Sequence, residues 1–121
     1  MNLNVIHVGK ETVAEVGAEE PVVRTPQDAL DLLATAQYRH EATCLLLREG
    51  HLTPAFFDLK TGLAGDILQK YTNYKMKLVV VGDFAGVTSR SLEAFILESN
   101  RGRQVAFMPD RAAALGHIAA W

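Results

Sequence analysis

Several features are scarce or missing in this 121-residue chain, and each absence excludes a class of protein. Only one cysteine, Cys44, is present, which excludes an intramolecular disulfide scaffold. The net charge of −2 provides no basic field for gripping the phosphate backbone of a nucleic acid. No apolar run approaches the roughly 18 residues of a membrane span, and residues 1 to 9 lack the pattern of a signal peptide. We therefore expect a soluble, cytoplasmic protein that binds neither nucleic acid nor membrane.

Motifs for catalysis, cofactors and metals are also missing from the sequence. There is no Walker-type phosphate loop, no glycine-rich dinucleotide loop and no Gly-x-Ser-x-Gly nucleophile elbow. The four histidines are scattered, with no i, i+4 pair, which argues against zinc. Cys44 lies in an apolar run, where burial raises the pKa of a thiol and makes it a poor nucleophile. We therefore predict no catalytic residues, no cofactor and no metal ion.

The residues that are present indicate a single α/β domain spanning residues 1–121. Hydrophobic residues make up 49% of the chain and charged residues 21%, as in ordinary globular proteins. Alternating or continuous apolar runs predict five strands: Leu3 to Val8, Thr12 to Val16, Thr43 to Arg48, Lys77 to Gly82 and Gln104 to Met108. Helical spacing and capping residues predict helices over 26 to 38, 90 to 100 and 110 to 120, and a short turn followed by a long helix over 54 to 74.

The predicted order, β-β-α-β-α-β-α-β-α, is typical of a mixed, mostly parallel sheet with helices packed on it. Strands that alternate with helices need crossover connections and should be parallel, while the opening hairpin adds an antiparallel edge. In such sheets the loops at the carboxyl ends of the strands usually carry the function. Here those loops are Arg48 to Thr53, Asp83 to Ser89 and Met108 to Asp110, with Phe56 to Gly65 beside them.

Three blocks of the sequence resemble one bacterial family. The blocks are Phe56 to Lys70, Lys77 to Phe84, and Ser91-Leu92 with Phe95 to Gly102, all in register. They resemble the family called domain of unknown function 4180, over roughly residues 20 to 115. That resemblance implies no activity.

The segment Phe57 to Leu63 is more distantly similar to the sulfate-transporter and anti-sigma-antagonist (STAS) domain, whose strands and helices have a matching order. In that family a Phe-x-Asp-Ser-Ser-Gly-Leu segment opens the second helix, and a partner kinase phosphorylates one serine. This chain has one extra residue between Asp58 and the hydroxyl, and Leu59-Lys60 stand where a serine is expected. The resemblance implies a STAS-like fold and leaves Thr61 as the one residue that can inherit the phosphorylated role.

The candidate site is built around the same segment. Thr61 and Gly62 would lie at the amino end of a helix, where free amides and the helix dipole attract an anion, and Lys60 adds positive charge. Ser89 and Arg90 open the next helix on the same side. A structural interpretation stays open beside this one, in which Thr61 only caps the helix.

Carboxylates also cluster on this side of the predicted sheet. Asp58, Asp66 and Asp83 are near enough in the predicted fold for a pair of them to bind a divalent cation or to act as acid and base. The simpler interpretation is that Asp58 caps the long helix, that Asp66 lies in its first turns and that Asp83 ends a strand in a turn.

Two function hypotheses follow, and a third is compatible with both. The leading one is a small regulatory or protein-interaction domain that binds a protein partner at Thr61 without catalysis. The alternative is a domain that binds a small molecule or an anion in a pocket at the carboxyl ends of the strands. This alternative includes an enzyme. The combined candidate set is Asp58, Lys60, Thr61, Gly62, Asp83, Ser89 and Arg90. A homodimer that pairs the hairpin edge, Thr12 to Val16, fits either hypothesis.

Overall fold

A computed structural model describes residues 2–121. Five strands within this range form one sheet. The strands lie side by side in chain order, and only the pair β1–β2 is antiparallel. Their bounds are β1 (Leu3–Val8), β2 (Glu11–Val16), β3 (Cys44–Arg48), β4 (Lys77–Val81) and β5 (Val105–Met108). The predicted mixed, mostly parallel sheet and the predicted order of elements are confirmed.

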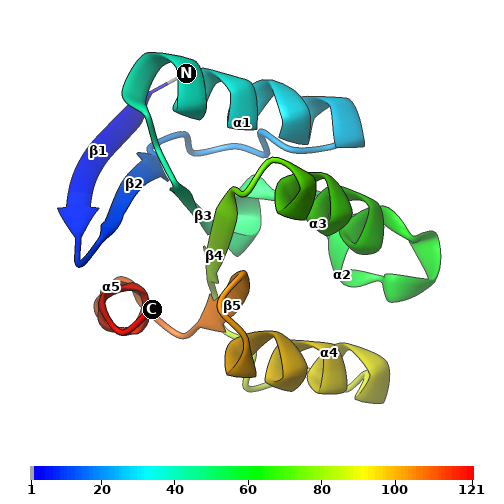
Figure 1. The fold of residues 1–121 in the computed structure, drawn as a ribbon. Coiled ribbons are helices and arrows are strands. Elements are labelled where there is room, and N and C mark those ends of the chain that lie inside the picture. Colours follow the sequence, from blue (N-terminus) through cyan, green and yellow to red (C-terminus); the bar gives the residue numbers. More distant parts are fainter. Residues whose placement is uncertain (1) are drawn as a thin grey trace.

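Helices cover both faces of the sheet, but unequally (Figure 1). Three long helices, α1 (Pro26–His40), α3 (Leu63–Asn73) and α4 (Arg90–Arg101), lie on one face, because each connects neighbouring parallel strands in the same direction. The last helix, α5 (Arg111–Ala119), lies on the opposite face. The remaining elements are the short α2 (Pro54–Phe57) and the 3-10 turns η1 (Glu49–His51) and η2 (Leu59–Thr61). No helix within residues 2–121 is both long enough and apolar enough to cross a membrane.

Side-chain caps determine where the long helices begin. The Thr25 hydroxyl accepts a hydrogen bond from the Asp28 amide at 3.1 Å, and Pro26 occupies the first turn of α1. The predicted cap at Ser89 is confirmed, since its hydroxyl accepts from the Leu92 amide at 3.2 Å. Asp110 caps α5 in the same way, through the Ala113 amide at 2.7 Å. These caps satisfy amides that have no partner inside the helix.

Strand alternation divides the core into two clusters. Leu45 and Leu47 of β3 point to the large cluster beneath α1, α3 and α4, whereas Cys44 and Leu46 point to the small cluster beneath α5. All four side chains are buried, which explains why β3 is a continuous apolar run. The buried Tyr71 hydroxyl of α3 donates to the Ala29 carbonyl of α1 at 2.8 Å and fixes the two helices together.

A buried ion pair joins the hairpin to the centre of the sheet. The Glu11 carboxylate, 5% exposed, accepts a hydrogen bond from Lys77 Nζ at 2.6 Å and another from the Thr43 hydroxyl at 2.9 Å. Burial alone raises the pKa of the Glu11 carboxyl, but these two hydrogen bonds and the charges of Lys77 and Lys10 outweigh it and hold that pKa below its ordinary value. Glu11 therefore stays ionised at neutral pH.

Two sequence-based expectations about local structure are wrong. The segment Thr12 to Val16 is not a free edge, because β2 pairs with β1 on one side and with β3 on the other. The edge that is open for pairing on this side of the sheet is β1. Asp58 does not cap the long helix, because the turn η2 intervenes and Gly62 is the N-cap of α3.

Candidate functional site

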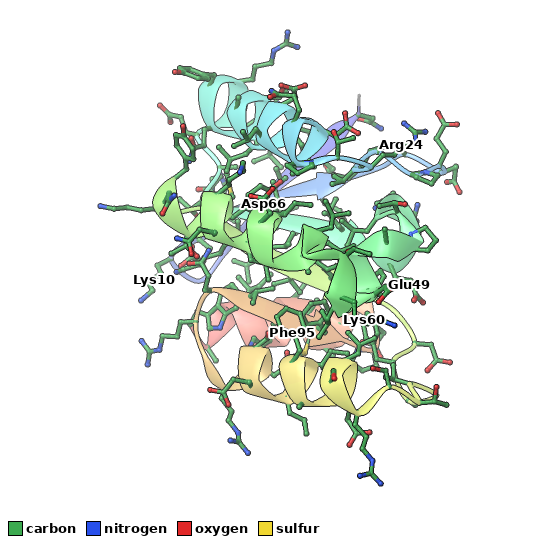
Figure 2. All side chains as sticks on the ribbon, turned by 90° about the vertical axis from the view of Figure 1, so that its right-hand side faces the viewer. Lys10, Arg24, Glu49, Lys60, Asp66 and Phe95 are labelled. Atoms are coloured by element: carbon green, nitrogen blue, oxygen red, sulfur yellow. The ribbon has the colours of Figure 1, made fainter. Side chains whose placement is uncertain are left out.

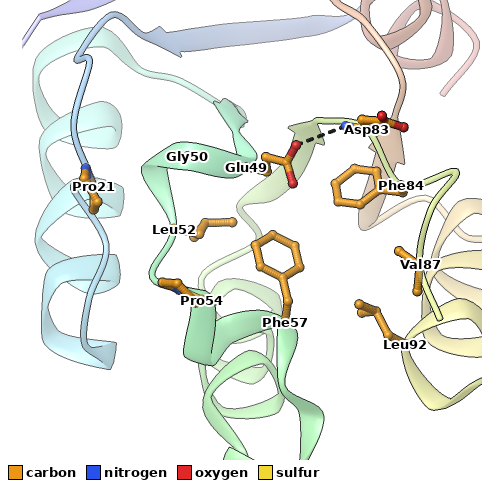
Figure 3. A pocket seen from close by; sticks show the side chains of 10 residues that line it. All are labelled: Pro21, Glu49, Gly50, Leu52, Pro54, Phe57, Asp83, Phe84, Val87 and Leu92. Atoms are coloured by element: carbon orange, nitrogen blue, oxygen red, sulfur yellow. Dashed lines mark hydrogen bonds between the residues drawn. The ribbon is translucent and has the colours of Figure 1, made fainter. Parts of the chain in front are cut away.

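A cleft of about 460 Å³ opens at the carboxyl ends of β3 and β4 (Figure 3). Parallel sheets commonly bind ligands at this edge. Except for Glu49 and Asp83, the lining residues are apolar or glycine. The full lining comprises Pro21, Glu49, Gly50, Leu52, Pro54, Phe57, Asp83, Phe84, Val87 and Leu92.

Backbone pairing builds the wall of the cleft that contains Pro21, Leu52 and Pro54. The Val22 and Val23 amides donate to the His51 carbonyl at 2.9 and 3.0 Å, and the Thr53 amide donates to the Val23 carbonyl at 3.0 Å. The loop after β2 and the loop after β3 are therefore joined as a short parallel bridge. This pairing holds the wall in place.

The buried His51 side chain anchors the loop that carries Glu49. Its Nδ1 accepts a hydrogen bond from the Arg48 amide at 2.9 Å, so that nitrogen carries no proton. Its Nε2 lies 2.6 Å from the Ala18 carbonyl and must be the donor there. His51 is 1% exposed, and these hydrogen bonds give it a structural role.

Aromatic rings form the opposite wall. The Phe57 and Phe84 rings lie 6.0 Å apart between centroids, and Phe84 meets Phe107 of β5 edge-to-face at 5.5 Å. Phe57 also packs against the buried Phe56 at 5.1 Å. The row of rings connects α2 to the sheet and keeps the aromatic wall rigid.

Two carboxylates stand at the top of the cleft. Glu49 Oε1 accepts a hydrogen bond from the Asp83 amide at 3.1 Å, and Asp83 Oδ1 accepts from the Ala85 amide at 3.2 Å. The Glu49 side chain lies directly on Gly82, where an added Cβ would be only 2.8 Å from Glu49 Cδ. In Figure 3 the second carboxylate oxygen of Glu49 faces the space beside Phe57 and Phe84.

The charge of the cleft is negative. No lysine or arginine belongs to its lining. Across the part of the chain that the structure describes, no basic nitrogen lies within 4.0 Å of the Glu49 or Asp83 carboxylates. Neither carboxylate has an ion-pair partner within that distance, so the local charge favours a cationic group over an anion.

A second, smaller cavity of about 220 Å³ lies on the α5 side of the same sheet edge. Its charged lining residues are Glu15, Arg48 and Arg111. Arg111 already forms a two-pronged ion pair with Glu15 at 2.8 and 3.1 Å, which raises the pKa of the Arg111 guanidinium. Arg48 donates to the Ala18 carbonyl at 2.7 Å. Because both guanidinium groups have partners, the larger cleft is the better candidate site.

Of the predicted site residues, only Asp83 lines the cleft. The others lie nearby on two connections: Asp58, Lys60, Thr61 and Gly62 between α2 and α3, and Ser89 and Arg90 at the start of α4. Figure 2 shows Lys60 and Glu49 at the same end of the molecule, with Lys10 at the opposite end. Asp66 does not join Asp83, since its carboxylate pairs with Lys70 at 2.6 Å.

The Thr61 segment is exposed, as expected, but its hydroxyl is engaged. Thr61 Oγ1 lies 2.8 Å from both the Ala55 and the Asp58 carbonyls, between which it shares its single proton, and it accepts from the Leu63 amide at 3.2 Å. Gly62 has a φ of +77°, a conformation that favours glycine, and a Cβ there would meet open space. The segment therefore forms a rigid, solvent-facing turn before α3.

Within residues 2–121 no group of three or more histidine, cysteine, aspartate or glutamate side chains is arranged to hold a metal ion. Cys44 is buried, and that burial, together with the charge of Glu11, raises the pKa of its thiol to about 12. The side chains that line the cleft offer charge, aromatic contact and apolar contact to a ligand.

Sequence reasoning missed the residues that form most of the cleft, above all Glu49, Phe57 and Phe84. The sequence did contain a signal for Glu49. Like Asp83, it is a carboxylate that follows a predicted buried strand. Phe57 and Phe84 lie in the segments that carry the family resemblance, but nothing in their spacing indicates that their rings meet.

Comparison with known proteins identifies the family but no activity. No curated protein and no solved structure matches the chain significantly. A family model described as domain of unknown function (DUF4180) matches residues 8–118, which is most of the chain. The chain therefore belongs to the DUF4180 family.

Proposed function

We propose that this protein is a small-molecule-binding domain whose ligand occupies the cleft at the carboxyl ends of β3 and β4. The observation that carries the proposal is the cleft itself: about 460 Å³ of space with rigid apolar walls and two carboxylates at one end. Ligand sites commonly combine such walls with a few polar groups that orient the bound molecule. The buried, reduced thiol of Cys44 supports a cytoplasmic location for this function.

The side chains of the cleft support ligand binding. Its lining includes no serine, threonine, cysteine, histidine or lysine that can act as a nucleophile. The Glu49 carboxylate accepts a hydrogen bond from the Asp83 amide, and the Asp83 carboxylate accepts one from the Ala85 amide, so both carboxylates are restrained. A ligand is therefore held by a fixed charge and by apolar contact.

A cleft-filling substitution tests this proposal. Val87→Trp places a large ring in the space beside Phe84 and Leu92, while Leu97→Trp makes a comparable change on an exposed part of α4 away from the lining. We expect a panel of amphipathic small molecules to raise the melting temperature of the wild type and of the Leu97→Trp control, but not that of Val87→Trp. No thermal shift for any member of the panel, or equal shifts for all three proteins, would contradict the proposal.

The exposed turn at Lys60–Gly62 favours a second candidate function, in which a protein partner binds at Thr61. Phosphorylation of Thr61 would break hydrogen bonds to the Ala55 and Asp58 carbonyls and change the shape of the turn. Affinity capture from the native bacterium tests this, with Thr61→Glu compared against Thr72→Glu, an exposed control on α3. A partner lost only with Thr61→Glu is the expected result; no enriched partner, or equal capture by both variants, contradicts it.

A further inference from the structure

We infer that the ligand of the cleft is an organic cation: an ammonium or amidinium group attached to an apolar, ring-sized body, with Glu49 as the residue that recognises the charge. This inference rests on the proposed function and names the chemical class of its ligand. It follows from three properties of the cleft: the restrained position of the Glu49 carboxylate, the aromatic rings beside it, and the lack of a lysine or arginine in the lining.

Two contacts restrain the exposed Glu49 side chain. Its Oε1 is fixed by the Asp83 amide at 3.1 Å, and its aliphatic stem lies on Gly82, where Cβ and Cγ would both be 2.9 Å from an added methyl group. The stem can adopt this position because Gly82 has no side chain. Its second oxygen, Oε2, receives no hydrogen bond from any residue in the range 2–121 and faces into the cleft (Figure 3). A preorganised acceptor of this kind loses little freedom when a ligand binds.

The surroundings of that oxygen suit a cation. The rings of Phe57 and Phe84 lie beside it, and a cation within about 6 Å of a phenyl centroid is attracted to the ring face. A cationic head placed against Glu49 therefore contacts a carboxylate and aromatic carbon together. The apolar side chains of Leu52, Val87 and Leu92 leave room for the body of the ligand below.

The charge balance disfavours an anionic ligand. Glu49 and Asp83 bring two negative charges to the cleft, and no lysine or arginine lines it. An anion would be repelled, while a neutral ligand would leave a carboxylate partly desolvated without a partner. A cation removes that penalty and gains a charge-assisted hydrogen bond.

A matched ligand series tests the inference. Calorimetric titration of the full chain at low salt compares 2-phenylethylamine, 2-phenylethanol and 3-phenylpropanoate, which share a ring and differ in charge. The amine should bind about tenfold more tightly than the alcohol, as expected for one charge-assisted hydrogen bond, and the carboxylate should bind most weakly. Raising the salt concentration should reduce the amine's advantage.

Glu49→Gln is the decisive variant, and Glu98→Gln is its control. Glu98 undergoes the same chemical change at an exposed position outside the cleft lining. We expect Glu49→Gln to bind the amine and the alcohol equally, whereas Glu98→Gln keeps the preference for the amine. If the alcohol binds the wild type as tightly as the amine, or if Glu49→Gln keeps the preference, the inference is wrong and the proposed function stands. If neither amine nor alcohol binds the wild type, the proposed function itself fails.

Discussion

Glu49 and Gly82 are in direct contact across the ends of two neighbouring strands. The Glu49 carboxyl carbon is 2.8 Å from the place that a Cβ on Gly82 would occupy. The contact leaves the Glu49 carboxylate beside the Asp83 amide, which donates to it at 3.1 Å. Because Gly82 has no side chain, it leaves the space in which the Glu49 side chain lies.

Gly82→Ala should displace Glu49 without unfolding the protein. The added methyl group collides with the stem of Glu49 and not only with its flexible end, so the side chain must change rotamer. We expect a loss of stability of about 1 kcal/mol and amine binding as weak as in Glu49→Gln. Gly116→Ala, on α5 outside the cleft lining and with open space around the added Cβ, is the control. Full amine affinity in Gly82→Ala would show that Glu49 does not depend on this contact.

Lys77→Met should destabilise the fold strongly, because it leaves the buried Glu11 carboxylate without its cationic partner. Removing one partner of a buried ion pair typically costs about 3 kcal/mol or more. The exposed Lys70–Asp66 pair has the same distance, 2.6 Å, yet Lys70→Met should cost no more than about 0.5 kcal/mol. Urea unfolding of both variants measures the difference. Similar losses for the two would mean that burial of Glu11 does not matter.

The ionised form of Glu11 should make stability depend on pH on the acid side. Its carboxyl pKa is lower in the folded protein than the ordinary value of 4.5, so the folded state binds its proton less readily than the unfolded state does. The stabilisation is fully present above pH 4.5 and is lost as the pH falls through the lower, folded-state pKa. Between neutral pH and pH 3, the free energy of unfolding should therefore decrease less for Glu11→Gln than for the wild type. Parallel pH curves would contradict this expectation.

The Cys44 thiol should be unreactive in the native protein. Burial and the nearby charge of Glu11 raise its pKa to about 12, so almost no thiolate exists at pH 8. A disulfide reagent such as Ellman's reagent should label Cys44 only as fast as the protein opens, and at once in denaturant. Rapid labelling under native conditions would show that the cluster beneath α5 opens readily.

Much of the architecture could be predicted from the sequence because its signals are local. Thr25-Pro26 and Ser89 indicate helix starts by hydrogen-bonding chemistry that involves only the next few residues. The apolar run at Cys44–Arg48 indicates a strand covered on both faces. The free edge of the sheet could not be found this way, because the position of β2 between β1 and β3 depends on pairing across the chain.

The cleft lies at the edge of the sheet where the sequence analysis placed a pocket, but largely different residues line it. Asp83 was found because it follows a buried strand, and the prediction of a pocket at the carboxyl ends agrees with the position of the cleft. The contact of Glu49 with Gly82 and the packing of Phe57 on Phe84 join residues more than 25 positions apart. Such contacts depend on how the loops pack, and a single sequence does not show them.

The most direct test of the central claim is a map of where an organic cation binds. Amide chemical shifts of the isotope-labelled protein, followed during titration with 2-phenylethylamine, report contact residue by residue. We predict that the largest changes occur at Glu49, Gly50, Asp83 and Phe84, around the cleft. Changes centred instead on the groove beside Tyr38 and Tyr74, or no changes at all, would contradict the account.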